Sequence, residues 1–201
     1  MGKMGGFAAG DMKKLQQQLL ALQKTQEDFL AGCAKELAAR LLAKVIKRTP
    51  VGDYSTEVEV EAKRNSKHHK KGETYKKRVN PSGKMGGTLR RGWTAKTQEE
   101  AEAGSGKPGA AEAAQYAASI PVRRVGDLLV VEIVNPVEYA SYVEYGHRQT
   151  PGRYVPELGK RLKNGWVPGK FMLTISEREI QTIAPKVLEA RLKKAMEECV
   201  K

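Results

Sequence analysis

The sequence predicts an α+β fold, in which a small antiparallel sheet packs against a long N-terminal helix and a C-terminal helix, with extended loop insertions. Apolar residues recur at helical spacing near both ends of the chain. Two β-branched runs lie between these helices. Two further stretches, residues 53–86 and 98–118, hold few large apolar side chains. We expect a single domain over residues 1–201 that carries these stretches as a basic and an Ala/Gly-rich insertion.

Residues 11–48 are predicted to form one long helix. Asp11 is a suitable N-cap, and the Thr49-Pro50 step ends the pattern because the residue before a proline avoids the helical region. Gly32 weakens the helix by about 1 kcal/mol relative to alanine. The apolar stripe of this helix consists of Leu15, Leu19, Leu22, Phe29, Cys33, Leu37, Leu41 and Val45.

The first insertion is strongly basic. From Lys63 to Arg91 the chain has eleven lysines or arginines and one acid, Glu73. Such a segment cannot bury enough apolar surface to offset the entropy of ordering it. We therefore expect residues 63–84 to form an exposed arm or loop that becomes ordered mainly when a partner is bound.

The middle of the chain is predicted to alternate between strands and flexible segments. Residues 89–97 suit a short strand around Trp93, and 98–118 suit a loop with short helical pieces around GSGKPG. The apolar, β-branched runs 120–125 and 128–134 meet at Gly126-Asp127, which predicts a hairpin. We expect the second run to belong to the core.

A short helix and a turn are predicted after this hairpin. Asn135-Pro136 stops the strand, residues 137–145 suit a helix, and Gly146 suits the position just after its C-terminus. Asn164-Gly165, between Leu162 and Trp166, suggests a tight turn.

The closing helix is predicted to start at a capping box formed by Ser176 and Glu179. It should reach about Val200, with Pro185 kinking or splitting it. Its apolar stripe consists of Ile180, Ile183, Val187, Leu188, Leu192 and Cys199.

The charge of the chain favours an anionic partner. The formal net charge is +13, with 29% charged and 40% apolar residues. Nucleic acid, a membrane surface or an acidic protein face would each attract it. Cys33 and Cys199 form no CxxC or Cys/His cluster, so two reduced thiols of a cytosolic product are expected. No membrane span, secretory signal or myristoylation signal is predicted.

The stretch 135-NPVEYASYVEYGHRQ-149 gathers the side chains that most resemble a site. His147, Glu138 and Glu144 could bind a metal or work as acid and base. Yet the two glutamates are six residues apart, on different helix faces, and no second histidine cluster supports them. We expect packing or an interface instead, with Tyr139, Tyr142, Val143 and Tyr145 as candidate subunit-interface residues and the charges solvated.

Other chemistry finds little support. His68 and His69 stand among lysines that repel a cation, so a solvated basic loop is expected. No GxSxG nucleophile motif and no phosphate-binding loop is present. We therefore expect no catalytic, metal or cofactor-binding residue and no enzymatic activity. Non-specific phosphate contact by the basic segment stays open, whereas sequence-specific DNA recognition lacks a groove-reading helix.

Four motif pieces follow one another along the chain: TPVG at 49–52, GTLRRGW at 87–93, NPVEYASYVEYG at 135–146 and PGKFM at 168–172. In this order they resemble the motifs of the gene-product-ten-like family of tailed-phage head–tail joining proteins. In that family the first piece usually runs directly into the second. Residues 53–86 and 98–118 are therefore insertions relative to the family pattern.

The resemblance implies a structural virion protein of the neck, made in the host cytoplasm. It implies a homo-oligomeric ring, a hexamer, around the DNA channel, with phage DNA passing through it non-specifically and no membrane partner. Neighbouring proteins would be a portal-side adaptor or stopper on one side and a tail tube or tail terminator protein on the other. Candidate docking or DNA-facing residues are Lys70, Lys71, Lys76, Lys77, Arg90 and Arg91. For Arg90 and Arg91, beside the second motif piece, a place in the channel and a structural role both stay open. A stand-alone, non-specific nucleic-acid-binding protein is the alternative.

Overall fold

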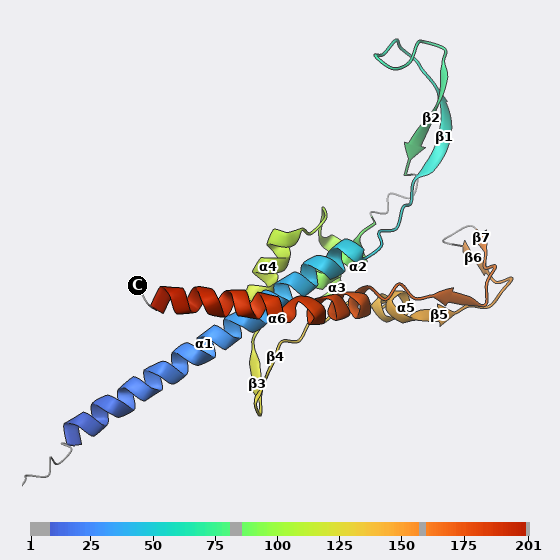
Figure 1. Cartoon of the computed structure of the whole chain (residues 1–201). Coiled ribbons are helices and arrows are strands. Elements are labelled where there is room, and N and C mark those ends of the chain that lie inside the picture. Colours follow the sequence, from blue (N-terminus) through green and yellow to red (C-terminus); the bar gives the residue numbers. More distant parts are fainter. Residues whose placement is uncertain (1–8, 81–85, 157–159, 200–201) are drawn as a thin grey trace, which may run out of the picture. The chain divides into compact units, whose positions relative to one another are not determined.

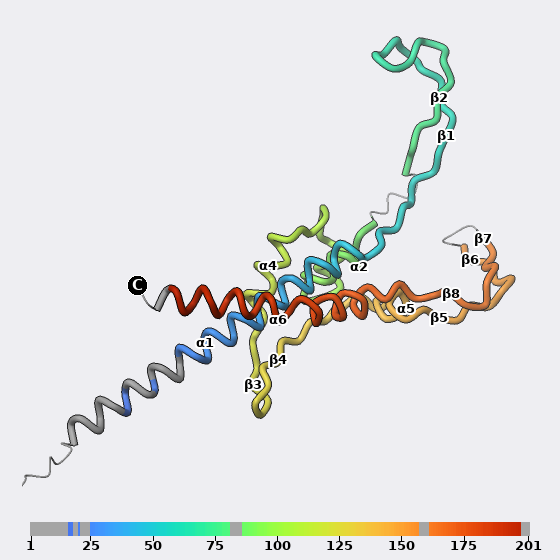
Figure 2. The backbone as a smooth tube through the Cα atoms, viewed as in Figure 1, coloured from blue at the N-terminus to red at the C-terminus, as the bar shows by residue number. Residues whose placement is uncertain are grey.

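The computed structural model describes residues 9–80, 86–156 and 160–199 of the 201-residue chain. Figure 1 shows the helices and strands of the chain, and Figure 2 traces the same backbone. The predicted α+β class is confirmed. The elements are α1 (Ala9–Arg48), β1 (Thr56–Glu61), β2 (Thr74–Val79), α2 (Thr88–Arg91), the 3-10 helix η1 (Gly92–Thr94), α3 (Gln98–Ala103), α4 (Ala110–Ser119), β3 (Arg123–Val125), β4 (Leu128–Val130), α5 (Ala140–Tyr145), β5 (Gly146–Arg148), β6 (Tyr154–Val155), β7 (Lys160–Arg161), β8 (Trp166–Pro168) and α6 (Met172–Cys199).

The elements gather into two compact units. Unit 1 comprises Met1–Val45, Gly109–Val134 and Leu173–Lys201, and unit 2 comprises Ile46–Pro108 and Asn135–Met172. The single domain predicted from the sequence stays a prediction. Each unit has its own buried side chains, so each is described separately below.

Unit 1 is built on helices α1, α4 and α6. A hydrogen bond connects α4 to α1: Lys35 Nζ donates to the carbonyl oxygen of Ala118 at 2.7 Å. An ion pair between Arg191 Nη1 and Glu36 Oε2, 2.8 Å long, connects α6 to α1. The buried apolar residues of this unit are Cys33, Ala38, Leu42, Val45, Ala113, Ala117, Ile120 and Ile180.

The first helix differs from the prediction at its start and agrees at its end. It begins at Ala9, so Asp11 lies inside the helix and is not its N-cap. It ends at Arg48, directly before Thr49-Pro50, as the proline rule predicts. Of the predicted stripe, Cys33 and Val45 are buried. The side chains of Leu15, Leu19 and Leu22 lie outside the described ones.

The last helix begins earlier than predicted. It starts at Met172, so Ser176 lies in its interior, fully buried, and the predicted capping box is wrong. Glu179 instead binds Lys44 Nζ of α1 at 2.6 Å. The helix continues through Pro185, so the predicted split is absent. Of its predicted apolar stripe, Ile180 is buried and Leu188 and Leu192 are exposed, whereas the side chain of Cys199 lies outside the described ones.

The hairpin predicted around Gly126-Asp127 forms, but it is shorter and more exposed than expected. Strands β3 and β4 hold three residues each and pair in antiparallel register, with Val125 opposite Leu128. The side chains of Val125 and Leu128 are 62% and 69% exposed. The expectation of a core strand over 128–134 is therefore wrong: Val130 and Val134 are exposed too, since no other strand pairs with the hairpin among the described residues.

In unit 2 the strand predicted over 89–97 does not form, and most of this stretch is helical. Residues 88–94 form α2 and η1 in succession, and Leu89 and Trp93 are both buried. Trp93 follows Leu89 by four positions, which places the two side chains on the same face of a helix. The pattern of this short apolar run is compatible with a strand or a helix. The helix buries the side chains of Leu89 and Trp93 together.

The strands of the described residues form four separate two-stranded antiparallel sheets. Strands β5 and β8 pair with each other and enclose the pair β6–β7 along the chain. The backbone N–H of Gln149 donates to the carbonyl oxygen of Gly165 at 2.9 Å. Asn164-Gly165 therefore lies in the connection from β7 to β8, beside the residues that follow β5. The predicted tight turn between Leu162 and Trp166 is wrong, because the strands on either side, β7 and β8, do not pair with each other.

Candidate functional site

The first two motif pieces meet at Thr49. The indole N–H of Trp93 donates to the Thr49 hydroxyl oxygen at 2.8 Å, and both residues are buried. Arg90 donates to the Thr49 carbonyl oxygen from Nε at 3.1 Å and from Nη2 at 2.5 Å. Thr49 directly follows α1, where the last backbone acceptors of a helix need partners from outside it. The TPVG piece therefore ends the helix and anchors the second piece at once.

The third motif piece joins the same cluster through Asn135. Its side-chain Nδ2 donates to the carbonyl oxygen of Leu89 at 2.8 Å, and its Oδ1 accepts from the backbone N–H of Val137 at 3.2 Å. Gly92 packs directly against it: a Cβ at this position would overlap Asn135 Oδ1 and Val137 Cγ2. A glycine in the second piece thus permits the close approach of the third.

The fourth motif piece holds the end of α5. The backbone N–H of Lys170 donates to the carbonyl oxygen of Val143 at 2.8 Å, and the backbone N–H of Phe171 donates to the carbonyl oxygen of Glu144 at 3.0 Å. Gly146 has a φ of 85°, and a Cβ on either Gly146 or Gly169 would collide with the backbone of the other segment. The two glycines therefore allow backbone-to-backbone packing of the third and fourth pieces.

Arg91 is placed differently from an exposed basic residue. It is 8% exposed, and its Nε donates to the Ala101 carbonyl oxygen at 2.8 Å. Nη1 and Nη2 reach the Gly86 carbonyl and the Thr88 hydroxyl at 3.2 and 3.3 Å. Arg90 is half-buried on Thr49. The guanidinium groups of Arg90 and Arg91 both donate to backbone carbonyls of unit 2. The exposed members of the candidate docking or DNA-facing residues are therefore Lys70, Lys71, Lys76 and Lys77.

The tyrosines of the third piece are exposed. Tyr139, Tyr142 and Tyr145 are 43%, 58% and 62% exposed, and Val143 is half-buried. Burial of part of the Tyr139 ring raises the pKa of its hydroxyl, and the neighbouring Tyr54 and Glu102 add to this effect. Trp166 and Phe171 are exposed in the same unit. Exposed aromatic side chains of this kind are typical of protein–protein interfaces.

His147, Glu138 and Glu144 are the side chains of the third piece that resemble a metal or acid–base site. No group of three or more potential metal ligands occurs among the described residues. His147 lies in β5 with its ring 5.7 Å from that of Tyr142, and its Nε2 is 3.2 Å from Gln149. Glu138 is exposed, but Glu144 is buried at 6% exposure, so the expectation that both charges are solvated is wrong for Glu144.

The basic insertion contains a β-hairpin that the sequence reasoning missed. Strands β1 and β2 pair over six residues each, from Thr56 opposite Val79 to Glu61 opposite Thr74. The alternation TEVEVE was the signal that could have revealed β1, because period-two patterns are typical of strands. Almost all of its residues are exposed, as predicted for the insertion, and residues 81–84 of the predicted arm lie outside the described ones.

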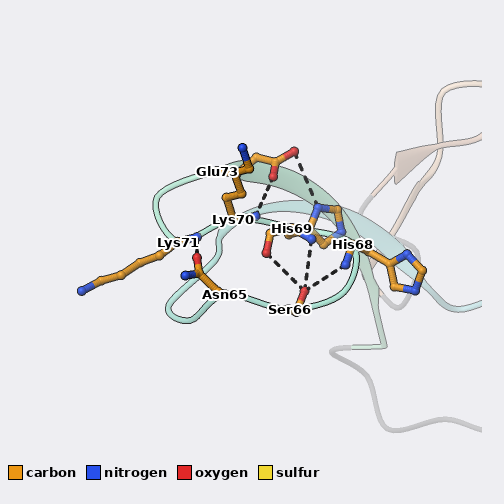
Figure 3. Close-up of polar contacts among 7 residues, drawn as sticks. All are labelled: Asn65, Ser66, His68, His69, Lys70, Lys71 and Glu73. Carbon is orange, nitrogen blue, oxygen red and sulfur yellow. Dashed lines mark hydrogen bonds and ion pairs between the residues drawn. The ribbon is translucent and has the colours of Figure 1, made fainter.

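Local hydrogen bonds organise the tip of this hairpin (Figure 3). Ser66 Oγ accepts from the backbone N–H of His68 at 3.4 Å and of His69 at 3.1 Å. Asn65 Oδ1 accepts from Lys71 N–H at 2.7 Å, and Glu73 Oε2 accepts from Lys70 N–H at 2.8 Å. Asn and Ser side chains stabilise turns in this way.

The tip displays positive charge. His69 stacks on Tyr75 with ring centroids 4.1 Å apart, which fixes one side of the loop. The one acid of the segment, Glu73, is engaged by Lys70 N–H and lies 3.8 Å from His69 Nδ1. Figure 3 shows the Lys71 side chain extending away from this network. The exposed basic side chains of the tip are Lys63, Arg64, Lys67, Lys70 and Lys71.

The comparisons with known proteins agree with the motif analysis. A family model described as "Bacteriophage HK97-gp10, putative tail-component" matches residues 13–146, which is more than half of the chain. Neither a curated protein nor a solved structure matches the chain. The matched residues include the first three motif pieces, and the fourth lies beyond them. In the described part of the chain, no helix is both long and apolar enough to cross a membrane. The chain belongs to the HK97-gp10-like family of bacteriophage tail components.

Proposed function

We propose that this chain is a ring-forming head–tail connector subunit, a neck or tail-completion protein that surrounds the DNA channel of a tailed phage. The family match makes it a structural phage protein related to tails. The observation that supports the finer proposal is that contacts join the four motif pieces in succession: the first to the second, the second to the third and the third to the fourth. Thr49, Trp93 and Asn135 make the buried or half-buried hydrogen bonds that join the first three pieces.

Exposed apolar surface supports assembly into a larger structure. Unit 2 exposes the rings of Tyr142, Tyr145 and Trp166, and unit 1 exposes Leu128 and Met196. A monomer in water gains nothing from exposing such groups together, whereas a subunit buries them against neighbours. We propose that Tyr139, Tyr142, Val143 and Tyr145 line a boundary between subunits of a homo-oligomeric ring, a hexamer.

The basic charge supports a role next to DNA or to acidic neighbours. A ring multiplies the charge of each subunit, so a net charge of +13 creates a strong positive field around a channel. Backbone-directed phosphate contacts carry no sequence information and allow DNA to slide. The hairpin tip is proposed to dock an acidic face of a neighbouring neck, adaptor or tail-terminator protein.

The test is imaging of phage particles made with and without this protein. We expect DNA-filled heads and separate tails when the gene is silenced, and joined particles when it is supplied in trans. Electron microscopy of the purified chain should show rings. Normal joined particles in the absence of the protein would contradict the connector role, and a persistent monomer at every concentration would contradict the ring.

The second candidate function is non-specific nucleic-acid binding by the hairpin tip. The organised cluster around Lys70 and Lys71 favours it, since five exposed basic side chains share one loop. A monomer that binds DNA tightly, with an affinity that falls steeply with salt, would favour this function over the connector.

A further inference from the structure

The β1–β2 hairpin carries opposite charges on its two strands. Strand β1 contributes Glu57, Glu59 and Glu61, and strand β2 contributes Lys76, Lys77 and Arg78. Each strand has one edge paired within the hairpin. Its outer edge faces no other strand among the described residues, because this sheet has only two strands. A lone two-stranded hairpin is marginally stable in water, and open edges tend to pair with further strands.

The two faces of the hairpin differ in chemistry. The register places Glu57 opposite Arg78 and Glu59 opposite Lys76, so these charges share one face. The other face holds Thr56, Val58, Val60, Tyr75, Lys77 and Val79, by the alternation of side chains along a strand. Val58 is 45% exposed and Val79 37%. An apolar strip therefore remains open on that second face.

Most of the charges on the hairpin are free to meet another strand. Arg78 lies 3.6 Å from Glu57 and 3.8 Å from Asp53, at an exposed position. Glu59 and Lys76 stand opposite each other, yet the described residues include no ion pair that involves either of them. Long side chains at unpaired positions can reach a strand added at the outer edge.

We propose that the hairpins of neighbouring copies pair edge to edge, with β2 of one copy beside β1 of the next. The proposal rests on the ring assembly proposed above. Copies related by rotation about an axis along the strands place β2 antiparallel to the next β1. Basic side chains then face glutamates on one face, and the valines continue one apolar strip on the other.

Charge decides against the other pairings. Two β1 edges would bring glutamates opposite glutamates, and two β2 edges would bring bases opposite bases, which is unfavourable in a sheet. The favoured contact joins unlike edges, so it is heterologous and repeats from copy to copy until a ring closes. The partner is therefore a second copy of this chain, added by strand pairing.

A charge-swap variant tests this pairing while it keeps the hairpin itself intact. In the swap, all six charges exchange sign: Glu57→Lys, Glu59→Lys, Glu61→Lys, Lys76→Glu, Lys77→Glu and Arg78→Glu. Within one swapped chain, positions 57 and 78 and positions 59 and 76 still carry opposite charges across the hairpin. Asp53, 3.8 Å from Arg78, is changed to Asn in both chains so that it favours neither. Between swapped and natural chains, like charges meet at every shared edge.

The measurement is energy transfer between donor- and acceptor-labelled full-length chains, together with particle size. We expect natural chains to mix with natural chains and swapped with swapped. Natural chains should exclude swapped ones, with at least about tenfold weaker co-assembly, because juxtaposed like charges oppose association strongly. Co-assembly of natural with swapped chains should increase as salt is added, because salt screens the repulsion between like charges.

The outcomes separate this proposal from the proposed ring. Free mixing of natural and swapped chains within rings would overturn the hairpin pairing and leave the ring intact. A natural chain that stays monomeric would overturn both. A chain in which residues 56–79 are replaced by a flexible linker gives a second arm: rings of unchanged stability would also overturn the pairing.

Discussion

The indole N–H of Trp93 lies 2.8 Å from the hydroxyl oxygen of Thr49, across 44 positions of sequence, and both side chains are buried. This contact joins the end of α1 to the α2–η1 segment, and it spans the inserted hairpin between them. The insertion can therefore vary while the framework on either side of it stays fixed.

Replacing Thr49 by Val should destabilise the protein by about 1–3 kcal/mol. The change keeps the size of the side chain but leaves the buried Trp93 N–H without an acceptor, which costs the desolvation of that donor. Urea unfolding followed by Trp fluorescence measures it. Thr49→Ser is the matched control, because it keeps the hydroxyl; equal losses in both variants would mean that the hydrogen bond is not the cause.

Replacing Gly92 by Ala should cost about 1–3 kcal/mol, since the added methyl group overlaps Asn135 and Val137 in a packed cluster. Asn135 cannot yield easily, because Leu89 and Val137 hold its side chain. Gly165→Ala is the control, as its Cβ would meet only Pro151 at 3.8 Å. Thermal unfolding of both variants compares them, and an unchanged melting temperature for Gly92→Ala would refute the close-packing account.

The stability of unit 1 should depend on pH through Glu36. Hydrogen bonds from Arg40 and then Arg191 hold the pKa of this carboxyl below its ordinary value of 4.5. A lowered folded-state pKa contributes stability that is complete above the unfolded-state value and is lost as pH falls through the folded one. The natural chain should therefore lose stability below about pH 4.5.

The Glu36→Gln variant should be less stable at pH 7 and should show a shallower loss on acidification. Unfolding curves collected between pH 7 and pH 3 provide the comparison. Arg191→Met removes one of the two donors and should give part of the same effect. Parallel pH profiles for the natural chain and Glu36→Gln would rule out this linkage.

Replacing Tyr142 by Asp should prevent assembly without unfolding the chain. Tyr142 is 58% exposed, so a charge there is tolerated in the isolated subunit but would be desolvated in an interface. Mass photometry gives the particle size, and circular dichroism checks the fold. Tyr142→Phe keeps the ring and should assemble normally; normal assembly of the Asp variant would place the interface elsewhere.

Replacing Lys70 and Lys71 by Ser tests what the hairpin tip contacts. If it docks an acidic neighbour, heads and tails should accumulate unjoined while the heads still hold DNA. Joined particles that lose or fail to eject DNA would show instead that the tip faces the channel. Replacing Lys76 and Lys77 in the hairpin stem is the comparison, since these residues belong to the proposed pairing between copies and not to the tip.

Several elements followed directly from local sequence. Thr49-Pro50 ended α1, Gly126-Asp127 formed a hairpin, and Gly146 closed α5. These features depend on the backbone preferences of proline and glycine, which act within a few residues. Other boundaries were missed. Ser176 became a buried helical position because α6 begins at Met172, where the chain leaves its contact with α5.

The candidate site was predicted in composition but not in arrangement. The exposed tyrosines and lysines were identified by type, while Arg91 was expected at the surface or in a structural role and lies buried on backbone carbonyls. Its neighbours in sequence do not reveal this, because Ala101 comes from α3, ten positions away. Burial of a charged group depends on which distant acceptors surround it.

By itself, the sequence determined the fold class, the family motifs and the excess of positive charge, because each depends on residue type and spacing along the chain. Only the tertiary structure decided that residues 88–94 are helical, that TEVEVE pairs with TYKKRV, and that Gly92 and Gly169 are contact points. Strand pairing and close packing join residues far apart in sequence. The stabilising free energy of strand pairing and of close packing comes from contacts that exist only once the chain has folded.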